Sequence, residues 1–383
     1  MKSEWVTRSI SNIAEINPRE TISKGSLAKK IPMDILQPFT RDIPGYQMEE
    51  FKGGTKFRNM DTIMARITPC LENGKTSQVR CLDNEEVGFG STEYIVFRAK
   101  EGTDPDYLYY LICSPLVRDP AIKSMVGSSG RQRVQTDVVA NLRIAVPDFD
   151  EQKKIGGLLK ALDDKIQLNT EINKNLADLL QTIYKERFAD TSLVVNQGIL
   201  SDISSYSRDK VAVSELNVST YFSTENMLSG KAGSTEATSL PTTPQTTACH
   251  KGDTLISNIR PYFKKIVYCE DKCGCSTDVL CFTPSKPQYS AYLFSTLYAD
   301  KFFAFMVAGS KGTKMPRGDK QQLMTYPVVL PSEAALDEFN SIALPLIEQI
   351  YSNRAENKRL SFLRDTLLPE LMSGEIDVSA VQF

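Results

Sequence analysis

The sequence predicts an α+β fold in which two repeated α/β blocks are each followed by one long helix. Three observations support this prediction. The chain has 383 residues, too many for one typical domain. Motifs of the first half recur in the same order in the second half. After Pro147 and again after Pro331, the hydrophobic period changes from the alternation of strands to the spacing of helices.

The repeat is clearest in two pairs of motifs. DTIMARITPC (61–70) aligns without a gap with DTLISNIRPY (253–262), and GSTEYIVF (90–97) resembles CSTDVLCF (275–282). These motifs are short β-rich runs, and the second pair has Ser-Thr near its start. Repetition over about half the chain predicts two domains of similar structure.

A third pair of motifs contains a glycine-rich loop with basic side chains. VGSSGRQRVQTD (126–137) in the first block corresponds to AGSKGTKMPRGD (308–319) in the second. Such loops can bind anions through backbone N–H groups. Neither copy has the spacing of a nucleotide phosphate loop, and neither lies between a strand and a helix. We therefore expect two equivalent loop tips and no nucleotide site.

Helical patterns follow each block. The first run, residues 151–188, has an apolar stripe with the alternating spacing of a coiled-coil seam: Ile155, Leu159, Leu162, Ile166, Leu176, Leu180 and Ile183. The second run places Ile342, Leu346, Ile350, Leu360 and Leu367 in the same role. Pro345 and Pro369 predict a kink or a shortening of the second helix.

Both seams pass through asparagines. Asn169 and Asn173 lie in the first helix, and Asn353 and Asn357 lie 184 residues later in the second. Asparagine at a seam position weakens packing but fixes register, because an unpaired buried amide is costly. The alternative is a slightly rotated helix that places the four amides in solvent.

The predicted organisation has four parts. Residues 1–148 and 191–331 are globular blocks, and residues 149–190 and 332–383 are helical segments. The segment 227–247, rich in Ser, Thr, Gly and Pro, is expected to be an extended loop.

Composition narrows the class of protein. No apolar run is long enough to cross a bilayer and no signal peptide is evident, so a cytoplasmic protein is expected. The eight cysteines are then expected to be reduced. CEDKCGC (269–275) suggests zinc, but it lacks a C-x₂-C spacing and the sequence has one histidine, so buried strand cysteines are favoured and no metal is expected.

Catalytic signatures are sparse. His250 is the one histidine available as a base, and no nucleophile-elbow motif is present. No Asn-Pro-Pro-aromatic motif of an amino-methyltransferase is found either. We expect no enzymatic activity in this chain alone.

The order and duplication of these motifs resemble the specificity (S) subunit of type I restriction–modification enzymes. The residues that carry the resemblance are RITPCLENGK (66–75), STYFSTENMLSGKAG (219–233), LLPELMSGEI (367–376) and the paired long helices. The resemblance implies a circular, pseudo-two-fold arrangement of two target-recognition domains, each reading one half of a bipartite sequence in double-stranded DNA. The two helices would pair antiparallel as a spacer.

The same resemblance implies the partners. Two modification (methyltransferase) subunits would dock on the helices and supply S-adenosylmethionine and the adenine-methylating site. Restriction (motor-nuclease) subunits would complete the complex. No cofactor is implied in this chain. If Asn169, Asn173, Asn353 and Asn357 fix the register of this spacer, inserting a helical turn should change the distance between the half-sites.

The loop tips provide the candidate DNA-binding residues. Small residues such as Ser128 and Ser129 let the backbone approach phosphates, and arginine and lysine supply charge or base contacts. The candidates are Arg131 and Arg133 in the first domain and Lys311, Lys314 and Arg317 in the second, with Arg66, Lys75, Arg260 and Lys264 as secondary candidates. The alternative is a solvated tip whose charges serve solubility.

Two other classes of function remain open from the sequence. One is a solitary sequence-specific DNA-binding protein or decoy subunit with no role in modification. The other is a coiled-coil adaptor whose globular blocks bind protein. Co-purification with a methyltransferase subunit and salt-dependent DNA binding distinguish these classes.

Overall fold

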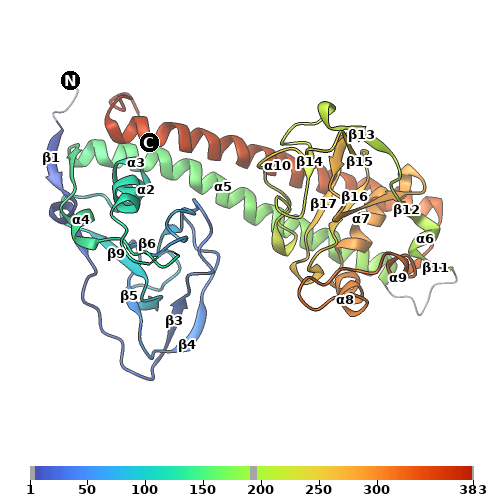
Figure 1. Ribbon diagram of the computed structural model, residues 1–383, viewed down its shortest axis with the longest axis horizontal. Coiled ribbons are helices and arrows are strands. Elements are labelled where there is room, and N and C mark those ends of the chain that lie inside the picture. The colour runs from blue at the N-terminus through green and yellow to red at the C-terminus, as the bar shows by residue number, and fades with distance from the viewer. Residues whose placement is uncertain (1–4, 129, 190–195, 382–383) are drawn as a thin grey trace. The chain divides into compact units, whose positions relative to one another are not determined.

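The computed structural model describes residues 5–128, 130–189 and 196–381 (Figure 1). The chain divides into two compact units. Unit 1 comprises Met1–Thr170 and Arg354–Phe383, and unit 2 comprises Glu171–Asn353. Each unit contains sheets and short helices together with part of each long helix, which confirms the predicted α+β fold.

Unit 1 contains two four-stranded sheets and one two-stranded sheet. The first sheet has the strand order β2 (Ala14–Ile16), β9 (Tyr94–Ala99), β6 (Thr62–Ala65) and β7 (Thr76–Gln78). The second has the order β4 (Gln47–Glu50), β3 (Leu27–Ile31), β8 (Gly88–Gly90) and β5 (Thr55–Phe57). Strands β1 (Val6–Ser9) and β10 (Arg143–Val146) form the third. The helices are α1 (Ile10–Ile13), α2 (Pro105–Cys113), α3 (Pro115–Lys123) and α4 (Thr136–Ala140).

Unit 2 repeats this plan. Its first four-stranded sheet has the order β12 (Ser204–Tyr206), β19 (Val279–Pro284), β16 (Thr254–Ser257) and β17 (Ile266–Tyr268). Its second has the order β13 (Lys210–Ala212), β15 (Gln245–Cys249), β18 (Cys273–Cys275) and β14 (Tyr221–Phe222). Strands β11 (Gln197–Ile199) and β20 (Pro327–Val329) form its two-stranded sheet. The helices are α6 (Leu200–Ile203), α7 (Ser290–Tyr298), α8 (Asp300–Ala308) and α9 (Lys320–Met324).

One sheet diverges between the units. In unit 1 the central strand β8 pairs parallel with β3 and antiparallel with β5. In unit 2 the central strand β18 pairs parallel with β14 and antiparallel with β15. The fourth strand is attached on opposite sides, because β4 pairs with β3 whereas β13 pairs with β15. The repeat therefore keeps these three strands and attaches the fourth strand to a different edge of them in each unit.

The long helices are α5 (Phe149–Tyr184), which continues into a π-helical turn at Lys185–Ala189, and α10 (Glu333–Ser373). Leu180 of α5 and Phe339, Ala343 and Ile347 of α10 lie in the core of unit 2. Ile155 and Leu159 of α5 and Leu371 of α10 lie in the core of unit 1.

Two details of the second helix differ from what the sequence predicted. The helix is not shortened at Pro345 or Pro369, because α10 runs through both positions. Buried residues on either side of Pro345, Ala343 and Ile347, hold the helix against the core at a place where proline removes one backbone hydrogen bond. Ile342, assigned to the seam, is 37% exposed, and the neighbouring Phe339 and Ala343 are the buried positions instead.

The four asparagines lie between the helices. In unit 1 the amide of Asn169 donates to Glu356 Oε2 at 2.7 Å and to Asn357 Oδ1 at 2.8 Å. In unit 2 the amide of Asn353 donates to Asn173 Oδ1 at 2.9 Å. Asn169 and Asn353 are 1% and 6% exposed, so the expectation that all four amides point into solvent does not hold.

The aspartate that opens the first repeated motif has different partners in the two units. In unit 1, Arg98 donates to the two carboxylate oxygens of Asp61 at 2.8 and 2.7 Å. In unit 2, Asp253 accepts instead from the thiol of Cys281 at 3.2 Å, and burial raises the pKa of this carboxyl. Both aspartates are 1% exposed.

Cys281 belongs to a group of buried cysteines in unit 2. The group comprises Cys249, Cys269, Cys273, Cys275 and Cys281, all free thiols. Cys273 and Cys275 lie in β18, as favoured from the sequence. Within the described residues, no set of three or more His, Cys, Asp or Glu side chains has an arrangement suited to a metal ion.

Candidate nucleic-acid interface

The first loop tip is a closed turn in unit 1. Val126 and Arg133 exchange both backbone hydrogen bonds, at 3.0 and 2.9 Å, so the loop returns on itself. Gly127 and Gly130 have φ angles of 138° and 79°, which L-residues with a side chain rarely adopt. A Cβ at Gly127 would lie 2.9 Å from the carbonyl oxygen of Arg131. Glycine is therefore required for the loop to close.

This tip is attached to the two other repeated motifs. The N–H of Thr68 donates to the carbonyl of Gln132 at 3.0 Å, and the N–H of Val134 donates to the carbonyl of Arg66 at 2.8 Å. The N–H of Arg66 in turn donates to the carbonyl of Glu93 at 2.9 Å. Three segments that are far apart in sequence thus meet at one place.

Unit 2 builds its tip with the same pattern. Lys311 and Arg317 exchange both backbone hydrogen bonds at 2.9 Å, and the N–H of Arg260 donates to the carbonyl of Pro316 at 2.8 Å. The N–H of Asn258 donates to the carbonyl of Asp278 at 2.8 Å. By these hydrogen bonds, Pro316, Arg317 and Asp278 hold the places that Gln132, Arg133 and Glu93 hold in unit 1, so that Arg317, and not Met315 as in the gapless motif alignment, corresponds to Arg133.

Each tip is also held by an ion pair at equivalent positions. Arg133 Nη2 lies 2.6 Å from Glu93 Oε1, and Arg317 Nη2 lies 3.0 Å from Asp278 Oδ1. The Arg133 guanidinium lowers the pKa of the Glu93 carboxyl. Both arginine side chains remain about half exposed, at 47% and 52%. Each arginine therefore attaches its loop to the Ser-Thr-acid motif, which is Ser91–Glu93 in unit 1 and Ser276–Asp278 in unit 2, while part of its side chain faces solvent.

Other residues of the tips carry charge without such an attachment. The side chains of Arg131 and Lys314 are exposed, and neither has a hydrogen bond or ion pair within the described part of the chain. Ser128 is exposed as well. Lys311 differs, because it is paired with Asp319. Ser129 lies outside the described residues.

The secondary candidates are more constrained. Lys75 Nζ donates to the carbonyl of Met33 at 2.8 Å, and Lys264 Nζ lies 2.8 Å from Asp300 Oδ1. Arg66 Nε is 4.0 Å from Glu93 Oε2. Arg66 and Arg260 each have a buried Nε without a hydrogen-bond partner among the described residues. Lys75 and Lys264 are thus used within the fold, whereas the two arginines still have an unused donor.

An aromatic pair in unit 2 was missed from the sequence. Tyr262 and Phe263 are 51% and 38% exposed, and their ring centroids lie 4.7 Å apart. They stand between Arg260 and Lys264, the two basic residues of the repeated motif. Exposed rings beside basic side chains suit base stacking or insertion at a base step. The signal was present in NIRPYFKK, where two aromatic residues interrupt a basic run.

Within the described residues, none of the helices combines the length and apolar character needed to cross a bilayer.

Comparison with known proteins finds similarity to one family over part of the chain. Residues 2–178 match the family model of the type I restriction modification DNA specificity domain. The type I restriction enzyme EcoAI specificity subunit of Escherichia coli is 32% identical over 158 residues, which are 40% of this chain and 26% of that protein. The match thus spans about a quarter of that relative's length.

Two further similarities extend over more of the chain. The type I restriction enzyme MjaIX specificity subunit of Methanocaldococcus jannaschii is 23% identical over 312 residues, covering 73% of this chain and 71% of that protein. The S subunit of a type I restriction-modification system from M. genitalium shares the fold, with a TM-score of 0.56 at 16% identity over 97% of this chain and 96% of that one. Residues 2–178 are thus similar to the type I restriction modification DNA specificity domain, and the relatives named above are specificity subunits of type I restriction enzymes.

Proposed function

We propose that this chain is the sequence-specific DNA-recognition subunit of a type I restriction–modification complex. The observation that carries the proposal is the repeated loop tip. The same backbone hydrogen bonds and the same arginine–carboxylate pair occur in both units, while the exposed residues differ: Arg131 at one tip, and Lys314 with Met315 at the other. A conserved frame with different exposed side chains suits two domains that each read a different half-site.

The basic residues would divide the work of recognition. Contacts to phosphate give affinity and register, whereas contacts to base edges give sequence preference. Arg133 and Arg317 position the loops by pairing with the carboxylates of Glu93 and Asp278. Arg131 and Lys314 are free to reach DNA, and an arginine there can bond a guanine edge through two N–H groups.

The helices α5 and α10 would set the distance between the half-sites. The layers Asn169–Asn357 and Asn173–Asn353 would fix the register of this spacer. Modification subunits would dock on the helices and bring S-adenosylmethionine and the adenine-methylating site, and restriction subunits would join the assembly. In this scheme the chain performs no catalysis, holds no cofactor and works in the cytoplasm.

The test is the methylation pattern of cells that carry this chain with its modification subunit. Sequencing should reveal N6-methyladenine in one bipartite motif. Exchanging residues 1–148 for the corresponding block of a relative should change one half of the motif. A change in both halves, or in neither, would contradict the two-domain model.

A second arm of the same experiment tests the spacer. Inserting seven residues into each helix should lengthen the gap between the half-sites and leave both half-sites unchanged. Failure of the chain to co-purify with a modification subunit would instead support the solitary or decoy class, and absence of salt-dependent DNA binding would support the adaptor class.

A further inference from the structure

The internal repeat raises a question of partner choice for the long helices. Each residue of α5 corresponds to the residue 184 positions later in α10, so Asn169 corresponds to Asn353 and Asn173 to Asn357. The burial follows the same correspondence: Asn169 and Asn353 are buried, and Asn173 and Asn357 are half-buried. Two helices with such similar seams can each pair with the other or with the same helix of a second copy.

The asparagine layers do not distinguish these partners. In the observed register Asn169 bonds to Asn357, and Asn173 bonds to Asn353. If α5 paired with α5 of a second copy in this register, Asn169 would face Asn173 of that copy. The same amide pairs would form, so these layers fix register and direction but not the partner.

A second polar layer, in unit 1, is not symmetric. Arg364 Nη1 of α10 donates to Asp163 Oδ1 of α5 at 2.6 Å, and the hydroxyl of Tyr110 donates to Asp163 Oδ2, also at 2.6 Å. Asp163 and Arg364 are 4% and 8% exposed. Burial opposes the charge of Arg364, but Asp163 and Asp365 keep the pKa of the guanidinium above its ordinary value. The layer is therefore a buried, hydrogen-bonded ion pair.

The corresponding positions of the repeat are apolar. Asp163 corresponds to Ile347 and Arg364 to Leu180. Both are 1% exposed and lie in the apolar core of unit 2. The fold thus tolerates an apolar pair at this layer, and the ion pair of unit 1 needs a reason other than stability, because buried ion pairs are often no more stable than apolar replacements.

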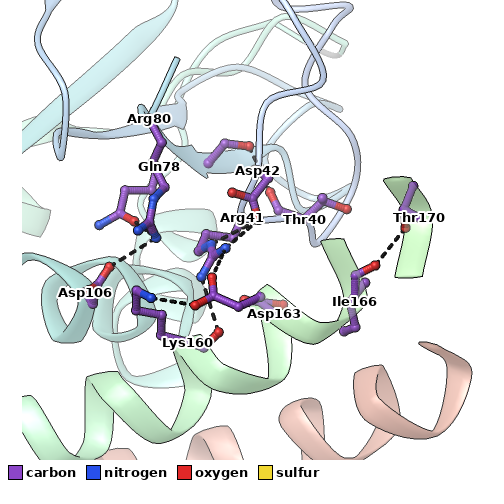
Figure 2. Close-up of polar contacts among 12 residues, drawn as sticks. Thr40, Arg41, Asp42, Gln78, Arg80, Asp106, Lys160, Asp163, Ile166 and Thr170 are labelled. Atoms are coloured by element: carbon purple, nitrogen blue, oxygen red, sulfur yellow. Dashed lines mark hydrogen bonds and ion pairs between the residues drawn. The ribbon is translucent and has the colours of Figure 1, made fainter. Parts of the chain in front are cut away.

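Arg41 and Lys160 form a second group of ion pairs on α5, next to this layer (Figure 2). Arg41, 2% exposed, reaches α5 from the loop before β4 and lies 2.7 Å from Asp164 Oδ1, while Lys160 pairs with the same carboxylate. A cavity of about 260 Å³ adjoins the layer and is lined by Arg41, Asp163 and Arg364 among others. In unit 2 the residue that corresponds to Asp164 is Glu348, which is exposed.

We propose that the pair Asp163–Arg364 selects the partner of each long helix, so that α5 pairs with α10 of the same chain and not with α5 of a second copy. In an α5–α5 pair of the same register, Asp163 would face Leu180 of the second copy. In an α10–α10 pair, Arg364 would face Ile347 of the second copy. Each arrangement buries a charge without its partner on the facing helix, which is strongly unfavourable. Only α5 with α10 brings the two charges together, and this inference does not depend on the proposed DNA function.

The sharpest test moves the arginine from one helix to the other. The double variant L180R/R364L keeps the net charge, but within one chain it leaves Asp163 opposite leucine and the new arginine opposite Ile347. In a dimer of paired α5 helices, each Asp163 would meet the new arginine of the other copy. We expect the mass measured by light scattering to move from the 42.8 kDa of the monomer toward twice that value, while the wild type stays at the monomer mass. A folded L180R/R364L chain that remains monomeric would overturn the proposal.

A second variant decides the matter if the first does not fold. D163I/R364L copies the apolar layer of unit 2 and should fold. Two differently tagged copies of this variant, mixed in denaturant and refolded together, should capture each other, whereas two wild-type copies should not. The matched control is E348Q/R359Q, which removes one acid and one base at exposed positions and should behave as the wild type. No capture with D163I/R364L, or equal capture with the control, would sink the idea.

Discussion

Arg133 and Arg131 stand two residues apart on the same loop, yet Arg133 is bound to the carboxylate of Glu93 at 2.6 Å and Arg131 projects without an ion pair among the described residues. The two side chains therefore have different roles. The first holds the loop against the Ser-Thr-acid motif, and the second is free for a ligand. The same division recurs in unit 2 between Arg317 and Lys314.

This division predicts different effects of two substitutions on DNA binding. Arg131→Ala should weaken binding and reduce the slope of log affinity against log salt by about 1, with no change in thermal midpoint. Arg133→Ala should weaken binding and also loosen the loop, which faster hydrogen exchange at Val126 would report. Lys24→Ala, at an exposed residue before β3, is the control with equal charge change. An equal loss of affinity from all three variants would argue for general attraction instead of a local site.

The aromatic pair predicts an effect confined to one half-site. Tyr262→Ala and Phe263→Ala should each reduce affinity by about 1–3 kcal/mol if the ring stacks on a base. Competition with DNA altered in one half-site or the other should assign this loss to the half read by residues 191–331. If the loss of affinity is the same whichever half-site is altered, the two rings stabilise the fold and do not contact a base.

The buried ion pair predicts a large loss of stability when one partner is removed. Asp163→Ala leaves the guanidinium of Arg364 buried with its main counterion gone, and we expect a loss of about 3–5 kcal/mol in the free energy of unfolding. Asp365→Asn, at a carboxylate that is 60% exposed, should cost less than about 1 kcal/mol. Urea denaturation of the full chain measures both. Similar values for the two variants would contradict the assignment of Asp163 as the main partner.

Asp300 predicts a dependence on acid pH. Its carboxylate lies 2.8 Å from both Lys231 Nζ and Lys264 Nζ, which lower its pKa from 3.8 to about 2. Because the folded-state pKa lies below the unfolded one, the stabilisation is present above pH ~4 and is lost as the pH falls toward ~2. The thermal midpoint of Asp300→Asn should therefore lie below that of the wild type at pH 7, and the difference should vanish near pH 2. A constant difference across this range would exclude the ion pair as its source.

Close packing of α5 on α2 predicts the effect of one added methyl group. A Cβ at Gly156 would lie 2.7 Å from the backbone nitrogen of Tyr107 and 2.9 Å from Asp104 Oδ1. Gly156→Ala should therefore cost about 1–3 kcal/mol in spite of the better helix propensity of alanine. Gly45→Ala, where nothing lies within 4 Å of the added atom, should change stability by less than about 0.5 kcal/mol. Thermal unfolding of both variants gives the comparison.

The sequence predicted those parts of the fold that depend on repetition and period. The repeated motifs predicted two similar units, and the 3.6-residue period predicted α5 and α10. The assignment of Ile342 to the buried stripe was wrong, because the apolar spacing alone does not show which of two adjacent apolar residues faces the core. The helix shortening predicted at Pro345 does not occur, since burial of Ala343 and Ile347 stabilises the helix around this residue.

The candidate site was predicted less completely. Basic residues of the loops could be named, but their hydrogen-bond partners come from strands far away in sequence. Nothing local shows that Arg133 meets Glu93 or that Lys75 meets the carbonyl of Met33. The buried pair of Asp163 and Arg364 was also missed, because two charges 201 residues apart look solvated until the antiparallel register is known. The roles of these residues in DNA binding and in register stay predictions.

Asp61 and Asp253 have different side-chain partners, and this difference limits where a hybrid between the two repeated units can have its junction. Each aspartate lies just before one strand and is satisfied by a side chain from another, Arg98 of β9 or Cys281 of β19. A crossover between those strands would join an aspartate to the wrong strand and bury a carboxylate without its donor. Crossovers outside the pair would carry acid and donor together. Viable hybrids should therefore have their junctions outside the segments 61–98 and 253–281, so that each aspartate and its side-chain donor are inherited together.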